Sequence, residues 1–506
     1  MRTTRLLLAA LSVGTLLSGC GPAAAPTATP TSRHYGSITF KSCTLANDFA
    51  SETTQAQCAS WKVAENPAQP QGRQIALNIA WLPATSEGNV AGDPVFFLAG
   101  GPGQAATETW PSLDAAFTEV RKHRHVILVD QRGTGKSNPL ICRNRDGDSA
   151  VMEDTEGVDA ALAIEQAKVF AEQCARQLKA DPRFYSTSDA IRDLDAVRAA
   201  LGVDKINLVG ISYGTRVAQQ YAHRYPQHTR SVVLDGVVPN ELVLGNEHAR
   251  NLDAALALQF AQCQKLPVCR ERFGADPRAQ LRGLMQRLKA SPVTVTYRDP
   301  LTGVEKTGTV SDGTVAGLTR MFAYAPQAAA LLPLMLNEAQ QGRYGPLMSL
   351  ASTLETQLGE QIMHGMQLSV ICAEDADLLR SDPADADTVL GNSIGEVLAA
   401  QCAVWPHAQR PKDFHAPLRS DLPVLLTSGE FDPVTPPRYG EQVVKNLANG
   451  RHLVLRGQGH GTFAVGCMPK LLTQFIENAN AKTLDATCLD AVGYVPPFTT
   501  FNGWEP

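Results

Sequence analysis

Several features that would place this chain of 506 residues in other protein classes are missing from its sequence. It has no Cys-x-x-Cys or His-Glu-x-x-His spacing, so a metal site has no sequence support. Gly135-Lys136-Ser137 is similar to the end of a phosphate-binding loop, but Asp130 stands where that loop needs its first glycine. Nucleotide binding is therefore not expected. The 45 basic residues, against 50 acidic ones, form no run that would bind nucleic acid, and no cofactor is implied.

A long apolar run is also missing, because the stretch Leu6–Leu17 is shorter than the roughly 20 residues of a membrane span. This stretch follows Arg2 and Arg5 and precedes Leu-Ser-Gly-Cys, which is the pattern of a secretory signal. A cysteine at this place resembles the lipobox of bacterial lipoproteins, in which Cys20 is lipidated and becomes the mature N-terminus. The alternative is an ordinary signal peptide that happens to contain a cysteine.

The lipobox predicts both the location of the protein and the start of its folded part. Residues 1–19 would be the signal peptide, and residues 20–34, rich in Pro, Ala and Thr, would tether the folded chain to a membrane through the lipid. We expect an exported protein, lipid-anchored to the bacterial cell envelope on the periplasmic side or at the cell surface. Removal of residues 1–19 takes away two arginines and no acid, which makes the formal net charge of −5 more negative.

Ten cysteines remain once Cys20 is set aside, and an even number in an exported protein favours disulfides. Their connectivity cannot be deduced from the sequence. As a hypothesis we pair neighbours along the chain: Cys43 with Cys58, Cys142 with Cys174, Cys263 with Cys269, Cys372 with Cys402, and Cys467 with Cys488.

Short apolar runs alternate with amphipathic segments in the first half of the chain. Continuous apolar runs of this length are typical of strands buried on both faces. The predicted strands are Arg73–Leu82, Pro94–Leu98, His125–Val129, a run through Ile206, Leu208 and Val209, and Ser231–Leu234; the predicted helices are Ser188–Leu201 and Thr215–Tyr225. Buried strands that alternate with helices indicate the α/β class, with a mostly parallel sheet wrapped by helices.

This alternation stops after Pro239 and returns only at the predicted strands Pro423–Thr427 and His452–Leu455. A block of this size between two strands would lie over the strand ends as a cap. It is expected to be mainly helical, with helices at Asn251–Cys263, Arg278–Lys289, Gln327–Gln341 and Leu350–His364 and a hairpin around Val293–Val310. The predicted division of the folded chain is a first core part at 35–240, a cap at 241–418 and a second core part at 419–506.

Gly210-Ile211-Ser212-Tyr213-Gly214 has the pattern of a nucleophile elbow, because it follows a predicted strand and begins a predicted helix. The glycines allow the serine to stand above the sheet, where a side chain at either position would collide with the neighbouring strand or helix. The same pattern recurs around Ser393, but only Thr388-Val389-Leu390 precede it, too few for a buried central strand. We interpret Ser393 as a coincidence.

A serine hydroxyl needs a base to remove its proton, and that base needs a carboxylate to hold its tautomer. Asp432 and His460 follow the two strands that return after the cap, so they are expected at the same sheet edge as Ser212. The order Ser, Asp, His is the one that the α/β-hydrolase fold requires. Two alternatives are that Asp432 is only a turn residue before a proline and that Glu430 is the acid.

The negative charge that develops on the substrate oxygen needs backbone N–H donors. One donor is expected from Tyr213, which directly follows the nucleophile. The other is expected from the glycine-rich loop Ala99–Gly103, at Gly101, although the loop could also be a simple turn.

These motifs together resemble the prolyl iminopeptidase and tripeptidyl aminopeptidase branch of the α/β-hydrolases, in particular its secreted bacterial members with a characteristic C-terminal region. The matching stretches, in family order, are Gly100–Gly103, Asp130–Ser137, Gly210–Gly214, Gly429–Pro436 and Gly459–Gly461. The resemblance implies an α/β-hydrolase fold with Ser212 as nucleophile, His460 as base, Asp432 as orienting acid, and Gly101 and Tyr213 as oxyanion donors.

Aminopeptidases of this branch hold the free ammonium of the substrate with carboxylates of the cap, since a buried cation needs a paired anion. Ile371-Cys372-Ala373-Glu374-Asp375 is similar to the corresponding cap segment, which makes Glu374 and Asp375 candidates for binding the substrate amine. The alternative is a solvated acidic pair near a disulfide.

The leading hypothesis is a serine aminopeptidase that releases one to three residues from the free N-termini of short peptides. A second hypothesis keeps the same triad and makes the substrate a carboxylic ester, because function belongs to the site rather than the fold. A third is a non-catalytic lipoprotein that uses the cap as a binding surface.

Overall fold

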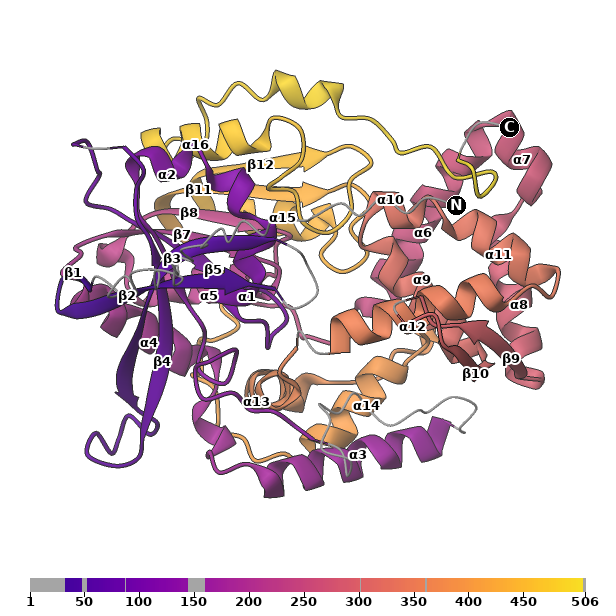
Figure 1. Ribbon diagram of the computed structural model, residues 1–506, viewed down its shortest axis with the longest axis horizontal. Coiled ribbons are helices and arrows are strands. Elements are labelled where there is room, and N and C mark those ends of the chain that lie inside the picture. Colours follow the sequence, from indigo (N-terminus) through magenta and orange to yellow (C-terminus); the bar gives the residue numbers. More distant parts are fainter. Residues whose placement is uncertain are drawn as a thin grey trace, which may run out of the picture. The chain divides into compact units, whose positions relative to one another are not determined.

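The computed structural model of the chain describes residues 32–47, 52–86, 88–143, 160–300, 302–359 and 362–503. The predicted signal peptide, Cys20 and nearly all of the tether lie outside these residues. A ten-stranded sheet runs through the structure in the order β1-β2-β3-β4-β6-β5-β7-β8-β11-β12 (Figure 1). Its strands are Arg33–Tyr35, Ile38–Ala46, Thr53–Ala64, Gln74–Leu82, Val95–Leu98 (β5), Val126–Val129 (β6), Ile206–Ile211 (β7), Thr229–Asp235 (β8), Ser420–Gly429 (β11) and Leu447–Leu455 (β12).

The six strands from β6 to β12 in this order pair in parallel, which confirms the predicted α/β sheet. The four strands β5, β6, β7 and β8 are almost fully buried, as their continuous apolar sequences predict. Because parallel strands end at the same edge, the loops after β5, β7, β8, β11 and β12 meet there. The predicted triad and oxyanion donors lie at or just after these strand ends, whereas Glu374 and Asp375 lie at the end of a helix of the inserted segment.

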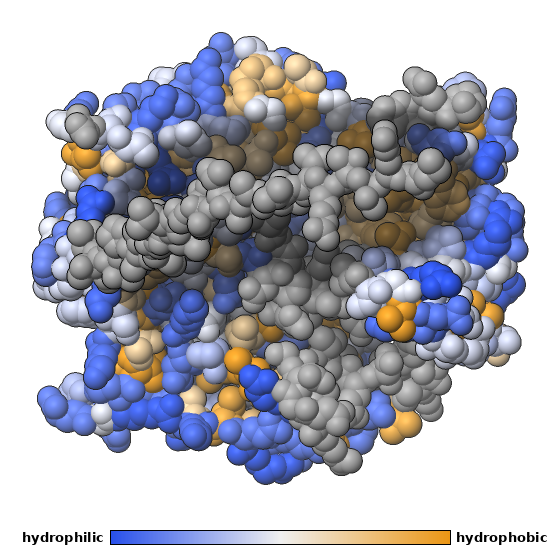
Figure 2. All heavy atoms as spheres, viewed as in Figure 1, coloured by the Kyte–Doolittle hydropathy of each residue, from blue (hydrophilic) through white to orange (hydrophobic). Residues whose placement is uncertain are grey.

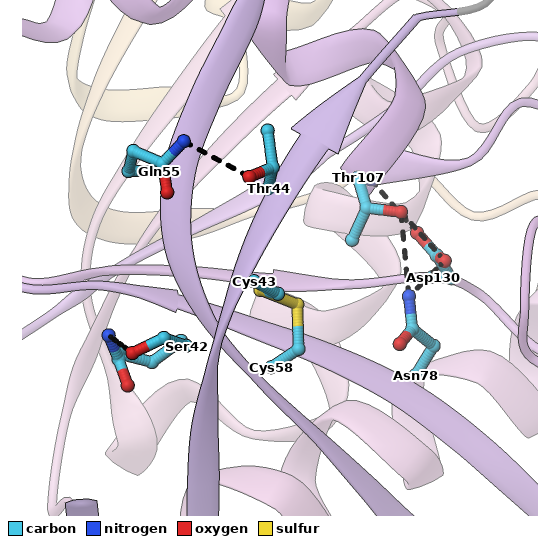
Figure 3. Close-up of a disulfide and its surroundings, with 9 residues drawn as sticks. Ser42, Cys43, Thr44, Gln55, Cys58, Asn78, Thr107 and Asp130 are labelled. Atoms are coloured by element: carbon cyan, nitrogen blue, oxygen red, sulfur yellow. Dashed lines mark hydrogen bonds between the residues drawn. A yellow bond between two sulfur atoms is a disulfide. The ribbon is translucent and has the colours of Figure 1, made fainter. Parts of the chain in front are cut away.

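The first four strands form an antiparallel extension of the sheet, β1 to β4. Only β4 is predicted from the sequence. In β2 and β3, exposed polar residues interrupt the apolar ones, so neither strand has the continuous apolar run of a central strand. The disulfide Cys43–Cys58 joins β2 to β3 (Figure 3).

Helices cover both faces of the parallel strands and enclose two apolar cores. The core on one face includes side chains of α4 (Thr187–Ala200) and α5 (Tyr213–Arg224), and the core on the other face includes side chains of α16 (Met468–Asn478). The remaining described helices of this part are α1 (Ala106–Thr109), α2 (Val120–His123), α3 (Ala160–Gln177) and α15 (Pro437–Val444). None of the described helices is long and apolar enough to cross a membrane.

A large, mainly helical segment lies between β8 and β11 and has an apolar core of its own. It contains the hairpin of β9 (Val293–Arg298) and β10 (Glu305–Val310), as predicted. Figure 1 shows α6 to α12 grouped beside the sheet, with α13 and α14 nearer to α3. They are α6 (His248–Lys265), α7 (Pro267–Phe273), α8 (Pro277–Ala290), α9 (Asp312–Ala323), α10 (Pro326–Ala329), α11 (Leu332–Gln340), α12 (Gly345–Gly359), α13 (His364–Glu374) and α14 (Ser393–Cys402).

Two predicted helices of this segment were wrong in their bounds. The prediction Gln327–Gln341 is two helices, because the chain turns at Ala330 and Leu331 and begins again with a proline in the first turn of α11. The prediction Leu350–His364 is also wrong. Helix α12 ends at Gly359, and His364 begins α13 after the extended residue Met363.

All five predicted disulfides are confirmed, including Cys263–Cys269 and Cys372–Cys402 within the inserted segment. Each joins two cysteines that follow one another along the chain with no other cysteine between them. Among the described residues of the face in Figure 2, hydrophilic residues predominate and apolar ones gather in separate patches.

Candidate active site

Ser212 lies between β7 and α5 in a strained backbone conformation, with φ of 56° and ψ of −126°. Few residues other than glycine adopt a positive φ, and such strain at a functional position costs on the order of 1–3 kcal/mol. The surrounding contacts maintain it, because the Ser212 N–H donates to the carbonyl oxygen of Asp235 at 2.8 Å. The serine is only partly buried, whereas the adjacent Tyr213 is buried.

Both glycines of the elbow are required by close packing, as the sequence predicts. A Cβ atom at Gly210 would lie 2.4 Å from the carbonyl oxygen of Gly214. A Cβ atom at Gly214 would lie 2.2 Å from the carbonyl oxygen of Leu98. The turn at Ser212 therefore depends on a helix that packs directly onto two strands.

The imidazole of His460 pairs with the buried carboxylate of Asp432. Their Nδ1 and Oδ2 atoms are 2.8 Å apart, and Thr435 Oγ1 lies within hydrogen-bond distance of both groups. Asp432 also accepts the N–H groups of Val434 and Thr435. These bonds fix the carboxylate and leave Nε2 as the ring nitrogen that does not face it.

The same contacts set the protonation of the pair. Burial lowers the pKa of His460, but the charge and hydrogen bond of Asp432, with the charge of Asp235, outweigh burial and raise this pKa above its ordinary value. Burial raises the pKa of Asp432, but His460 and the two backbone donors outweigh it and hold this pKa low. The arrangement stabilises an imidazolium paired with a carboxylate.

The two alternatives to these residues lie elsewhere. Glu430 accepts the N–H of Gly457 and the hydroxyl of Tyr494 rather than contacting His460. Ser393 is exposed at the first turn of α14, where its hydroxyl donates to the carbonyl oxygen of Leu390, and no strand precedes it. Of the two Gly-x-Ser-x-Gly stretches, only the one at Ser212 follows a strand of the sheet.

Ser212 and His460 both lie next to the end of β8. Ser212 bonds to Asp235, and a Cβ atom at the next residue, Gly236, would lie 3.1 Å from His460 Cε1. The hydrogen bonds of the described residues do not include one between Ser212 Oγ and His460. Such bonds are often long or poorly aligned before a substrate is bound.

Asp235 is a buried carboxylate that the sequence reasoning missed. It accepts the N–H groups of Thr462 and Phe463 at 2.7 and 3.2 Å, and the hydroxyls of Thr462 and Thr427 at 2.8 and 3.0 Å. It thereby holds the loop that follows His460 against the ends of β8 and β11. A signal was available, since an acid at the end of the strand next to the nucleophile strand must face the same edge.

The glycine-rich loop after β5 lies against the elbow. A Cβ atom at Gly100 would lie 3.1 Å from Ser212 Cβ, and Gly101 has a φ of 103°, a conformation that favours glycine. As the first residue of α5, Tyr213 has an N–H without an acceptor inside the helix. Gly100, the residue before Gly101, thus packs against the serine, and Tyr213 follows it in the chain.

The buried carboxylate of Asp130 holds helix α1, which follows this loop. Asp130 accepts the N–H and hydroxyl of Thr107, both at 2.9 Å, and the amide of Asn78 at 2.7 Å (Figure 3). The inserted segment fixes the loop from the other side, because the N–H of Met363 donates to the carbonyl oxygen of Gly103 at 3.0 Å. The backbone near Ser212 is therefore held by both core and cap.

Glu374 and Asp375 are fully buried beside the elbow helix, not solvated. Glu374 Oε1 accepts the N–H of Thr187 at 2.7 Å, and the Thr187 hydroxyl lies 2.6 Å from the hydroxyl of Tyr213. Burial raises the pKa of Glu374 to about 7, against the opposing charge of Arg216. Arg216, one turn after Ser212 on α5, is a second residue that the sequence reasoning missed.

The two acids differ in their remaining contacts. Asp375 Oδ2 accepts from Arg216 Nη1 and from the N–H of Leu244, both at 3.1 Å, and its Oδ1 lies 3.3 Å from His415 Nε2. No hydrogen-bond donor of the described residues reaches Glu374 Oε2, and Arg216 Nη1 is 3.7 Å from it. Among the described residues, Asp375 Oδ1 also lacks a hydrogen-bond donor, but Asp375 already accepts two donors and Glu374 only one, so Glu374 is the acid with more capacity left for another partner.

The described residues contain no group of three or more His, Cys, Asp or Glu arranged to hold a metal ion. A strained serine and a histidine paired with a carboxylate at the same sheet edge are the groups that acyl transfer needs.

Comparisons with known proteins agree with this arrangement. Residues 93–305 match the family model described as alpha/beta hydrolase fold, and residues 387–488 match the model described as TAP-like protein. The fold and the matched models define the class of the protein as an α/β-hydrolase.

Curated relatives match along most of both chains. Serine protease Hip1 of Mycobacterium tuberculosis is 26% identical over 89% of this chain and 91% of its own. Tripeptidyl aminopeptidase of Streptomyces lividans is 23% identical over 85% of this chain and 83% of its own. Carboxylesterase B of Mycobacterium tuberculosis is 27% identical over 88% of this chain and 91% of its own. A solved proline iminopeptidase from Mycobacterium smegmatis is 17% identical over 83% of this chain and 98% of its own, with a TM-score of 0.40.

More narrowly, the chain belongs to the α/β-hydrolases that carry a TAP-like C-terminal region, and it is a serine hydrolase.

Proposed function

We propose that this serine hydrolase is an aminopeptidase that releases one to three residues from the free N-termini of short peptides through an acyl-enzyme. Relatives named serine protease and tripeptidyl aminopeptidase, each matched over most of its length, support peptide substrates. The observation that carries the specificity for a free N-terminus is Glu374, a fully buried acid with one oxygen that lacks a hydrogen-bond donor.

In this proposal Ser212 is the nucleophile. His460 removes the proton from the Ser212 hydroxyl as the oxygen attacks the peptide carbonyl, and Asp432 stabilises the imidazolium that forms. His460 then donates that proton to the leaving amine. In the second half of the reaction a water molecule, activated by the same base, releases the acyl group.

The N–H groups of Gly101 and Tyr213 are proposed to bind the oxygen that becomes negatively charged. The contact of the adjacent Gly100 with Ser212 and the place of Tyr213 as the first residue of α5 support this role. Loss of one such donor typically lowers kcat by about 10²- to 10³-fold, because fixed donors stabilise the transition state more than the bound substrate.

Glu374 is proposed to bind the ammonium of the substrate. A substrate ammonium would supply the donor that Glu374 Oε2 lacks, and the charge of a buried acid favours a cation as its partner. Asp375 is proposed to act in support, since Arg216, Leu244 and His415 already surround its carboxylate.

We also propose that Cys20 carries a lipid and that residues 20–34 tether the enzyme to a bacterial membrane outside the cytoplasm. The sequence pattern before Cys20 supports this, as do five disulfides, which persist in oxidising compartments. Growth with a radioactive fatty acid should label the wild type but not Cys20→Ser. Equal labelling of the two would refute the anchor.

The specificity is tested with three substrates: a peptide with a free N-terminus, its N-acetylated form and a neutral aryl ester. The wild type should cleave the free peptide and lose at least about tenfold in kcat/KM on the acetylated form, since a charge-assisted hydrogen bond contributes about 1.5–3 kcal/mol. Glu374→Gln should raise KM for the free peptide and spare the ester. An equal loss on both would remove this role from Glu374.

The second candidate is a carboxylic ester hydrolase with the same triad. The relative named Carboxylesterase B favours it. Under this alternative the wild type would hydrolyse the aryl ester but neither peptide.

A further inference from the structure

Arg320, in helix α9 of the inserted segment, is a partly buried cation without an acidic partner among the described residues. Its contacts are with Tyr324: Nη2 donates to the tyrosine hydroxyl at 3.3 Å, and the guanidinium carbon lies 5.8 Å from the ring centre. Arg250 and Arg278 of the same segment each pair with aspartates. Arg320 therefore keeps a charge that the fold does not neutralise.

Tyr324 connects this arginine to the base of the proposed mechanism. Its carbonyl oxygen accepts the N–H of His460 at 2.8 Å, and its ring lies edge-on to the imidazole with 5.3 Å between ring centres. A Cβ atom at Gly459 would lie 2.1 Å from the same carbonyl oxygen. One aromatic ring thus separates the Arg320 guanidinium from the imidazole.

A cation at this place works against the reaction, because His460 must become positively charged when it takes the serine proton. The pKa of His460 is raised overall, because Asp432 and Asp235 outweigh burial. The charge of Arg320 acts with burial and makes this rise smaller. The other titratable group nearby, His248 at the start of α6, does not compensate. Burial, followed by the charges of Arg320 and His460, lowers its pKa to about 3, so it is neutral at physiological pH.

An anion bound at Arg320 would remove this unfavourable effect. The leaving group of the proposed reaction lies beside His460, because this histidine must hand its proton to the leaving amine. When the leaving group is a short peptide, its other end is a free carboxylate. An extended residue spans about 3.3–3.6 Å, so one to three residues cover the separation set by the Tyr324 ring.

We propose that Arg320, with the hydroxyl of Tyr324, binds the C-terminal carboxylate of the leaving peptide. This inference rests on the proposed aminopeptidase function and adds a substrate class to it: peptides that end one to three residues after the cleaved bond with a free carboxylate. A guanidinium suits this ligand, because its planar N–H groups match the two oxygens of a carboxylate.

The test compares one peptide in two forms, as the free acid and as the C-terminal amide, both with a free N-terminus and a leaving group of two residues. The wild type should prefer the acid by roughly 10- to 100-fold in kcat/KM, the size of one hydrogen-bonded ion pair. In Arg320→Gln this ratio should fall to about one, and Arg320→Lys should restore part of it.

Arg287→Gln is the matched control, because Arg287 is an exposed arginine of the same segment whose side chain contacts Gln340. It should keep the wild-type ratio. A ratio near one in the wild type, or an unchanged ratio in Arg320→Gln, would overturn the inference while leaving the aminopeptidase function in place. If the wild type cleaves neither peptide but hydrolyses an aryl ester, both the function and the inference are wrong.

Discussion

Asp235 holds Thr462 through both of its carboxylate oxygens, one on the N–H at 2.7 Å and one on the hydroxyl at 2.8 Å. The carbonyl oxygen of the same aspartate accepts the N–H of Ser212. Asp235, at the end of β8, therefore bonds to the nucleophile Ser212 through its backbone. Through its side chain it bonds to Thr462, two residues after His460. This makes Asp235 a positioning residue for the proposed triad.

Asp235→Asn should lower kcat about 10- to 100-fold with little change in KM, because the loop of His460 loses two charge-assisted bonds. It should also change the pH profile. His460 must be neutral to accept the serine proton, so kcat/KM rises with pH through the pKa of His460, which Asp432 and Asp235 hold above its ordinary value in the wild type. Loss of the Asp235 charge lowers that pKa and moves the acidic limb to lower pH.

Asp130→Asn is the control for this change. It also replaces a buried carboxylate that accepts N–H and O–H donors, but one that supports the glycine-rich loop and not His460. It should reduce activity and leave the acidic limb where it is. A limb at the same pH in all three proteins would show that Asp235 is only structural.

Ser212→Ala should lose at least about 10³-fold in kcat, since no other group replaces the nucleophile. Ser393→Ala, its twin by sequence pattern, should keep wild-type activity because Ser393 only caps a turn of α14. A fluorophosphonate probe and intact-mass measurement check this directly. One adduct is expected on the wild type and on Ser393→Ala, and none on Ser212→Ala; an unlabelled wild type would favour a non-catalytic protein.

Asp432→Asn should lower kcat by about 10⁴-fold, because the amide cannot hold the same histidine tautomer or stabilise the imidazolium. Glu430→Gln is the matched change two residues earlier. Its partners are Gly457 and Tyr494, so activity should stay within a few-fold of the wild type. Steady-state kinetics on an aryl ester separate the two, and a larger loss in Glu430→Gln would reassign the acid.

KM for peptides with a free N-terminus should depend on pH through Glu374. The pKa of this acid is raised to about 7 by burial, and only its ionised form attracts an ammonium. KM should therefore fall as pH rises through about 7 and rise again as the peptide amine, with a pKa of about 8, loses its proton. The fall in KM near pH 7 should vanish in Glu374→Gln. A fall that persists in the variant would belong to another group.

The central parallel strands β5 to β8 were predictable because they are buried on both faces and so have continuous apolar sequences. Strands β2 and β3 were not, since their exposed polar residues do not differ from those of a loop. Helix bounds in the inserted segment depended on turns at Ala330 and Met363, which tertiary contacts determine. One of these is the hydrogen bond between Met363 and Gly103.

The candidate site was predictable where a residue type follows a strand: Ser212, Asp432 and His460 each do. Contacts between distant segments were not. Nothing in the sequence around Tyr324 indicates that its carbonyl oxygen accepts a bond from His460, because 136 residues separate them and the inserted segment must fold first. The same holds for Arg216, whose acidic partners lie far along the chain.

The pairing of the disulfides has a consequence for how the chain matures. Both cysteines of each pair precede the first cysteine of the next pair along the chain, so an oxidase acting on thiols in the order in which they emerge would make all five correct bonds. No bond needs to wait for a distant partner, and none crosses another. Production of this enzyme should therefore require a catalyst that forms disulfides but be insensitive to one that rearranges them.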